Sequence, residues 1–202
     1  QGQHGAGITT DGQVIWVAFK PKYGTLDGAM IRYDTATGQT GYKNGSIPSQ
    51  HILNPVYDSA SNELVAGTSY LSDCLTATPV HNTAFAVLLD PNTMEITTKA
   101  EGPEGIDTLH CHGPLADRQW LFQSGQELVL FDTGKGTLSP SQVQLPEVTS
   151  KVLFAGRPGL FLLQVRNELH TWDANSNTSK HLLTWSADLV NRWWVHGSDI
   201  TF

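Results

Sequence analysis

The chain has 202 residues, enough to bury a sizeable core, with a formal net charge of −7 and only 15% charged residues. Its 12 Lys and Arg residues are scattered and form no basic stripe, which argues against a nucleic-acid partner. No apolar run approaches the ~20 residues that span a bilayer, so we expect no membrane span.

A strand that ends in an apolar or aromatic residue, followed by Asp and a small polar turn, occurs four times along the chain. The four segments are MIRYDTATGQ (30–39), AVLLDPNTME (86–95), LVLFDTGKGT (128–137) and LHTWDANSNT (169–178). An Asp at such a place accepts hydrogen bonds from its own turn. We call Asp34, Asp90, Asp132 and Asp173 the marker residues, because each ends the third strand of a repeated unit.

Each marker residue follows a predicted hairpin and precedes a more polar stretch with a period of two. The hairpins, in chain order, pair 14–19 with 29–33, 63–67 with 84–89, 120–123 with 127–131, and 160–165 with 168–172. Alternating stretches such as MEITTKA (94–100) suit an exposed outer strand. Together with the apolar stretch before each hairpin, every unit therefore has four strands.

The spacing of a second landmark, the turn between the first two strands of each unit, points to the same repeat. The landmarks Asp11, Asp58, Asp117, Arg157 and Asp199 are separated by 47, 59, 40 and 42 residues. Four strands with a period of about 40–45 residues are the signature of propeller blades. A β-sandwich also has short antiparallel strands, but it has no reason to repeat one device at this interval.

We therefore predict one all-β domain, a β-propeller of four-stranded antiparallel blades within a larger ring. The expected blades cover approximately 4–44, 51–101, 107–145 and 150–184, with an incomplete fifth at 191–202. The six Trp residues are mostly expected between blades, with Trp185 as the best candidate for a ligand contact.

Three stretches resemble known repeat proteins. DGQVIWVAF (11–19) and GAMIRYDTATGQ (28–39) are similar to the repeats of bacterial-type β-propellers, the group that includes YVTN, quinoprotein-like and streptogramin-lyase-like proteins. NPVYDSASNELVAGTSY (54–70) resembles a set of sugar-associated propeller proteins. The resemblance implies an extracytoplasmic or secreted protein that binds sugars or protein partners, and it carries over no catalytic residue.

In a propeller the first strand of each blade lines the central channel. Counting seven residues back from each landmark gives the positions His4, His51, His110, Ser150 and Arg192. His4, His51 and His110 could bind a divalent metal through neutral imidazoles, while Arg192 favours an acidic ligand. The alternative is a wet polar lining with no ligand.

His112 is expected on the same side of its strand as His110, with Cys111 on the other side. Cys111 is expected to pack between sheets, and the sequence leaves open whether it pairs with Cys74.

The loop 68–84 is the longest departure from the repeat. Long loops on a rigid scaffold often carry binding residues, and Tyr70 could stack on a sugar while Asp73 or His81 bonds its hydroxyls. The alternative is a structural cap or a staple between blades.

Three functions are compatible with these patterns. The first is a binding module that recognises a glycan or a protein at one face of the propeller. The second is an enzyme, a lyase or hydrolase of acidic sugars that uses channel histidines, with Arg192 on the substrate carboxylate. The third is a purely structural segment of a larger protein. The sequence contains no nucleophile elbow, phosphate-binding loop or zinc-protease helix that would decide between them.

Overall fold

The computed structural model describes residues 5–22, 24–71, 78–125, 127–145, 149–185, 194–196 and 199–201. These residues form strands and turns without any helix, and the predicted all-β fold of four-stranded antiparallel sheets is confirmed. In the described part of the chain no helix is long and apolar enough to cross a bilayer.

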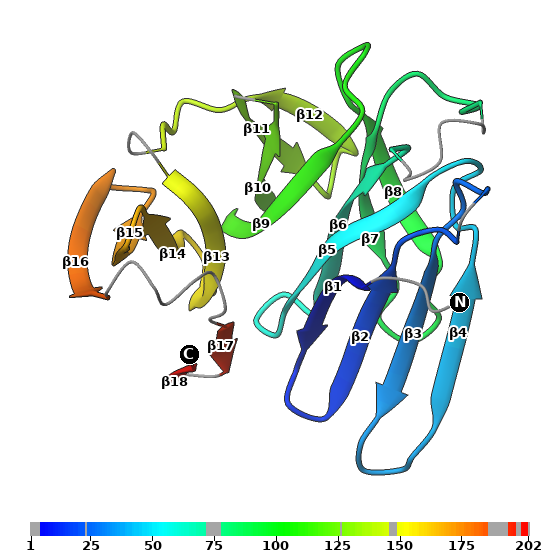
Figure 1. Ribbon diagram of the computed structural model, residues 1–202, viewed down its shortest axis with the longest axis horizontal. Coiled ribbons are helices and arrows are strands. Elements are labelled where there is room, and N and C mark those ends of the chain that lie inside the picture. The colour runs from blue at the N-terminus through cyan, green and yellow to red at the C-terminus, as the bar shows by residue number, and fades with distance from the viewer. Residues whose placement is uncertain are drawn as a thin grey trace.

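Each of the four complete sheets is a meander in which consecutive strands pair, and we call these sheets blades 1 to 4 (Figure 1). Blade 1 consists of β1 (Gly5–Thr10), β2 (Val14–Phe19), β3 (Ala29–Asp34) and β4 (Thr40–Asn44). Blade 2 consists of β5 (His51–Asp58), β6 (Glu63–Ser69), β7 (Phe85–Leu89) and β8 (Ile96–Glu101). Blade 3 consists of β9 (Leu109–Ala116), β10 (Gln119–Ser124), β11 (Glu127–Asp132) and β12 (Thr137–Pro140). Blade 4 consists of β13 (Thr149–Arg157), β14 (Leu160–Val165), β15 (Glu168–Asp173) and β16 (Thr178–Thr184).

A two-stranded ladder follows blade 4, formed by β17 (Trp194–His196) and β18 (Asp199–Thr201).

The first strands of the blades are neighbours in space. β1 contacts β5, β5 contacts β9, and β9 contacts β13, although about fifty residues separate each pair. Figure 1 shows β5, β9 and β13 near the middle of the molecule, with the later strands of each blade further out. Consecutive sheets thus step around one axis, as the blades of a propeller do.

The marker residues close the turns between third and fourth strands in the way their chemistry predicts. In all four turns the Asp Oδ1 atom accepts hydrogen bonds from the backbone N–H groups two and three positions on, at 2.8–3.2 Å. The bonds from Thr93 and Asn92 lower the pKa of Asp90, because they stabilise its carboxylate form. One local interaction therefore sets the same turn four times.

The cores lie between blades rather than within them. Trp16 of blade 1 is buried against blade 2, where its ring stacks on Tyr57 at a centroid distance of 4.8 Å and its Nε1–H donates to the Pro91 carbonyl at 2.8 Å. Trp120 of blade 3 is buried against blade 2 and donates to Glu63 Oε2 at 2.8 Å. Trp172 packs between blades 3 and 4. These three indoles fill the gaps between sheets, as the sequence suggested.

Candidate functional site

The connections of the meander divide between the two ends of the blades. Because successive strands run in opposite directions, the connections from second to third strands and from blade to blade all emerge at the end where β5 and β9 begin. We call this end the loop face. The connections from β2 to β3 and from β6 to β7 are the long ones here, whereas β14 and β15 are joined by two residues. The loop face therefore holds most of the irregular backbone on which binding residues tend to lie.

The return of the β6–β7 loop, residues 78–84, is fixed by hydrogen bonds to the segment that links blades 2 and 3. Ala84 N–H donates to the Ile106 carbonyl at 2.8 Å, and the Thr83 hydroxyl donates to the Pro103 carbonyl at 2.8 Å. From the other side, the buried Gln50 amide donates to the Thr83 carbonyl at 2.6 Å. The returning arm of the loop is thus hydrogen-bonded to both neighbouring links between blades, and it connects them.

The outgoing arm of the same loop is fixed by the same link. The Ser69 and Thr108 hydroxyls lie 2.8 Å apart, and Tyr70 N–H donates to the Asp107 carbonyl at 3.2 Å. Tyr70 is half-buried here, while the next side chain, Leu71, is 53% exposed. The predicted ligand residue Tyr70 therefore sits in a fixed backbone at the rim of the loop face.

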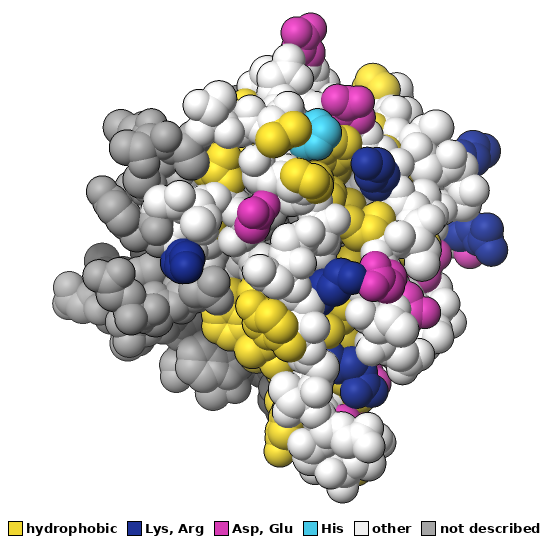
Figure 2. Space-filling view, turned by 90° about the vertical axis from the view of Figure 1, so that its right-hand side faces the viewer, with side chains coloured by type: hydrophobic (Ala, Val, Ile, Leu, Met, Phe, Trp, Pro, Cys, Tyr) yellow, Lys and Arg dark blue, Asp and Glu magenta, His cyan; other side chains and the backbone are white. Residues whose placement is uncertain are grey.

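Exposed aliphatic side chains lie on both arms of the loop. Besides Leu71, Val80 is 69% exposed. His81 follows Val80, and its ring meets Phe85 edge to face at a centroid distance of 5.2 Å. Figure 2 shows a histidine with several hydrophobic side chains beside it near the top of that view, and acidic and basic side chains around them.

His110 lies near the inner ends of two blades. Its Nδ1 atom is 3.3 Å from the side-chain nitrogen of Asn54, on β5 of the preceding blade. The Asn54 amide donates, so Nδ1 accepts and the ring is neutral in this arrangement. Burial lowers the pKa of His110, and the Asp107 carboxylate opposes this shift only in part. His110 is thus held as a neutral hydrogen-bonding group.

His112 is buried between blades 3 and 4. Its Nε2 atom is 3.2 Å from Gln123 Oε1, and its ring also hydrogen-bonds the backbone of Val152 on β13. Burial, with a smaller contribution from the neighbouring His110, lowers its pKa to about 4, although both hydrogen bonds act in the opposite direction. His112 therefore joins two first strands and lies out of reach of a large ligand.

His51 does not occupy the position of His110. His110 pairs with Gln123 on β10. The residue of β6 at the position of Gln123 is Gly67, and Gly67 pairs with Leu53, so Leu53 holds the position of His110 in blade 2. A bulge between Leu53 and Val56 adds a residue to β5, so residues that are equally far from the turn in sequence are not equivalent in the sheets. His51 is buried beside Gly28, where a Cβ atom on Gly28 would come within 2.3 Å of the His51 Cβ. Its side chain belongs to the contact between blades 1 and 2.

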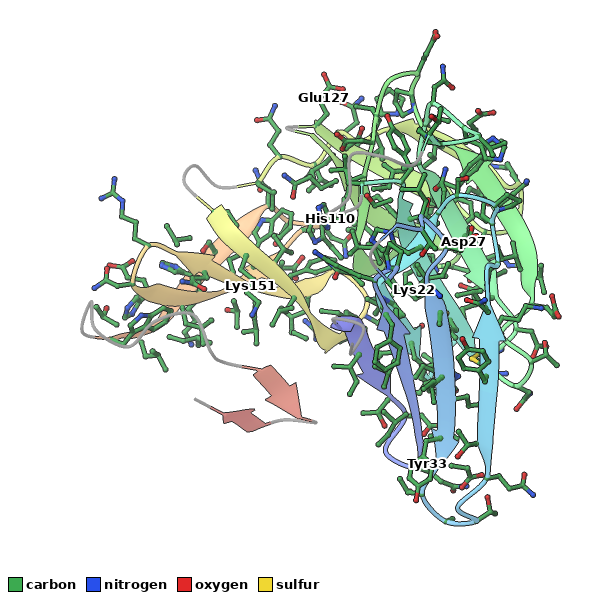
Figure 3. The ribbon with its side chains drawn as sticks, turned by 45° about the vertical axis from the view of Figure 1, so that its right-hand side comes forward. Lys22, Asp27, Tyr33, His110, Glu127 and Lys151 are labelled. Carbon is green, nitrogen blue, oxygen red and sulfur yellow. The ribbon has the colours of Figure 1, made fainter. Side chains whose placement is uncertain are left out.

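Register instead places Lys151 at the position of His110. Lys151 pairs with Gln164 on blade 4, as His110 pairs with Gln123 on blade 3. Figure 3 labels both side chains near the middle of the molecule, on β9 and β13. Burial lowers the pKa of Lys151. The inner end of the site thus combines an imidazole, an amide and an amine.

His4, Asp73 and Arg192 lie outside the described residues, as does Cys74. Among the described residues no group of three or more His, Cys, Asp and Glu could hold a metal ion. The metal centre and the lyase hypothesis depend on His4 and Arg192 and stay predictions. Cys111 is a free, buried thiol within the core between blades 2 and 3.

Sequence reasoning missed Asn54 and Gln50, which connect blades at this end. Asn54 has a φ of 48° at the bulge of β5, a conformation that Asn tolerates better than most residues. An Asn-Pro pair inside a strand pattern was the available signal, because both residue types favour irregular backbone. Nothing local marks Gln50, since its partners Thr68 and Thr83 come from the long loop.

Comparisons with known proteins identify the fold. No protein-family model matches the chain, and no curated protein matches it. It is similar to the β-propeller domain of Swd1 from Myceliophteria thermophila, with 11% identity and a TM-score of 0.56 over 98% of this chain and 61% of that one. A protein of unknown function from Bacteroides caccae matches with 13% identity and a TM-score of 0.55, over 90% and 61%. The β-propeller domain of the Trilobed protease from Pyrococcus furiosus matches with 7% identity and a TM-score of 0.51, over 91% and 58%.

These likenesses concern the fold alone, because the identities are low. The chain spans about three-fifths of each of the three solved structures. The narrower resemblance to YVTN, quinoprotein-like and streptogramin-lyase-like proteins stays a prediction. The described sheets and these comparisons together establish that the chain folds as part of a β-propeller.

Proposed function

We propose that this chain is a non-catalytic binding module that takes up a protein partner on its loop face. The observation that carries the proposal is the pair of exposed aliphatic side chains, Leu71 and Val80, on a loop whose two arms are hydrogen-bonded to the links between blades. Single exposed apolar residues are ordinary on protein surfaces. Leu71 and Val80 lie on the two described arms of the loop, so a partner can bury them without ordering these arms first.

A protein fits these side chains better than a sugar does. Saccharides bind through aromatic faces and dense hydrogen bonds, whereas aliphatic anchors suit a partner's own apolar side chains. Tyr70 and the inner residues Asn54 and His110 supply hydrogen-bonding groups on the same side of the molecule. We infer that apolar side chains of the partner contact Leu71 and Val80, and that its polar groups bond to residues nearer the propeller axis.

The charges around the loop indicate which protein segment would fit. Three acidic residues lie here: Glu101 at the end of β8, and Glu104 and Asp107 in the link between blades 2 and 3. Glu101 and Glu104 are exposed. Lys99 is the nearby cation, and its Nζ lies 5.2 Å from the Phe85 ring centroid. Opposite charges favour encounter and correct orientation. The expected partner segment therefore combines apolar and basic side chains.

Selection from a random peptide library tests this proposal directly. We expect the wild-type chain to enrich peptides with apolar and basic residues, and Leu71→Asp or Val80→Asp to weaken the selected peptides at least about tenfold, or roughly 1.4 kcal/mol. Leu182→Asp is the matched control, because Leu182 is an exposed aliphatic residue on the outer strand of blade 4. It should leave affinity unchanged.

A glycan array run in parallel separates the two ligand classes. Glycan binding that is lost in Tyr70→Ala and kept in Val80→Asp would contradict the protein-partner proposal and favour the sugar ligand. Peptide affinities that are equal in wild type, Leu71→Asp and Val80→Asp would also contradict it. A location outside the cytoplasm belongs to the same proposal and rests on the sequence resemblance.

A further inference from the structure

A pair of histidines lies on the two outer strands of blade 4, outside the loop-face site. His170 on β15 is paired directly with His181 on β16. The two ring centroids lie 5.3 Å apart, and the ring planes are nearly perpendicular, at 82°. Figure 1 shows β15 and β16 at the left of the molecule, away from blades 1 and 2. Because directly paired residues project to the same side of a sheet, the two imidazoles share one surface.

The register that pairs the two histidines depends on a bulge in β16. Leu169 pairs with Leu183, so a regular ladder would put Leu182 opposite His170. His170 is paired with His181 instead, which makes Leu182 the extra residue of the bulge. Bulges are common beside functional sites, where they direct a side chain away from its regular position. Here the bulge places a second imidazole opposite the first.

Two hydrogen bonds orient the ring of His170. Its Nε2 atom lies 2.9 Å from Glu168 Oε2 on the same strand, and its Nδ1 atom lies 3.3 Å from the Ser179 hydroxyl on β16. A carboxylate only accepts, so Nε2–H donates to Glu168, and the neutral ring then has its lone pair on Nδ1. Histidines that bind metals are commonly oriented by a carboxylate in this way. His170 is therefore positioned to offer Nδ1 as a ligand.

The spacing of the two rings suits a shared metal ion. A zinc–nitrogen bond of about 2.1 Å puts each ring centroid about 3.2 Å from the metal, so two rings at a tetrahedral angle have centroids about 5.3 Å apart. The centroids of His170 and His181 are separated by this distance, 5.3 Å. His181 is exposed, and its Nε2 atom lies 2.9 Å from the Thr184 hydroxyl. Its ring has to rotate to direct a nitrogen at the metal, and solvent gives it room to do so.

We propose that His170 and His181 chelate a divalent transition-metal ion such as Zn²⁺, with Glu168 as the residue that positions His170. The described residues contain no group of three or more ligands, so this site is a two-ligand chelate whose other positions are filled by water or by a donor of a bound molecule. Neutral imidazole is a preferred ligand of zinc, and the Glu168 carboxylate adds a compensating negative charge. Lys180 pairs with Thr171 and so projects from the opposite side of the sheet. The bound metal links β16, the outermost strand of the blade, to β15.

Calorimetric titration of the whole 202-residue chain with Zn²⁺ tests the chelate. Wild type should bind Zn²⁺, and His170→Gln and His181→Gln should each weaken binding at least about tenfold, because a single imidazole cannot chelate. Glu168→Gln should weaken it less than either of these changes, since both ring nitrogens remain. His81→Gln is the matched control, because His81 is a partly buried histidine on the loop face. It should bind Zn²⁺ like wild type.

Nuclear magnetic resonance of the imidazole rings gives a second readout, and circular dichroism confirms that each variant folds. Added Zn²⁺ should shift the ring signals of His170 and His181 before that of His81. Equal Zn²⁺ affinity in wild type, His170→Gln and His181→Gln would overturn the proposal and place the metal at other side chains. A wild-type chain that binds no Zn²⁺ at millimolar concentration would overturn it too. Peptide binding at the loop face is measured in zinc-free buffer, so the two proposals can fail independently.

Discussion

Replacing Gly67 by Ala should lower the free energy of unfolding by about 3 kcal/mol, because the added methyl group has no room. Gly67 lies in β6, where β9 of the next blade approaches the sheet closely. A Cβ atom at this position would come within 1.7 Å of the Leu109 carbonyl oxygen and 2.7 Å of its carbon. Both atoms belong to the backbone of a first strand, so blade 3 would have to move away from blade 2. Urea denaturation followed by fluorescence measures the loss.

Gly41→Ala is the matched control for this substitution. Gly41 also lies within a strand, β4, and a Cβ atom there would meet its nearest neighbour, the Met94 methyl group, at 3.4 Å. This is ordinary contact with a flexible side chain, so stability should change little or rise slightly, because Ala restricts the unfolded chain more than Gly does. Equal stability of Gly67→Ala and wild type would mean that blades 2 and 3 do not pack as described.

Acid should destabilise the fold between pH 6.5 and pH 4 through His112. Its pKa is about 4 in the folded chain and near 6.5 when unfolded, so the unfolded state binds the proton first as pH falls. The contribution of the neutral ring is fully present above pH 6.5 and is lost as pH falls toward 4. From the two pKa values we expect a loss of about 2 kcal/mol at pH 5 relative to pH 8.

His112→Gln isolates this contribution, because the amide does not titrate. The variant is expected to be less stable at pH 8, where it loses packing, and to change less between pH 8 and pH 5 than wild type. His181→Gln is the control, since His181 is exposed on the outer strand β16 and should leave the pH dependence unchanged. Urea denaturation at the two pH values measures all three chains. Identical pH dependence in wild type and His112→Gln would refute the assignment.

The repeat was predictable because its cause is local. Each marker Asp bonds the N–H groups of its own turn, so Asp34, Asp90, Asp132 and Asp173 show in the sequence what they do in the structure. Alternating burial in β2 follows from the strand period in the same way. Trp16, Trp120 and Trp172 were expected between blades because large aromatic rings on strands seek burial.

The candidate site was harder to predict because it depends on register and on contacts between blades. Counting residues from a turn fails wherever a bulge adds a residue, and both β5 and β9 contain such shifts. His51 and His110 therefore looked equivalent in the sequence, and in the sheets they are not. The contact of Asn54 with His110 spans 56 residues, and no sequence pattern encodes it. Equally, Gly67 looks like any small strand residue until the approach of β9 is seen.

Nuclear Overhauser contacts in solution test most directly whether consecutive blades step around one axis. The decisive contacts join first strands of neighbouring blades, between the Asn54 side-chain amide and the His110 ring and between the His112 ring and Val152. We predict cross-peaks for both pairs, with β9 contacting β5 on one side and β13 on the other. Cross-peaks that place β9 against the outer strands β4 or β16 instead would contradict the propeller arrangement and, with it, the site on the loop face.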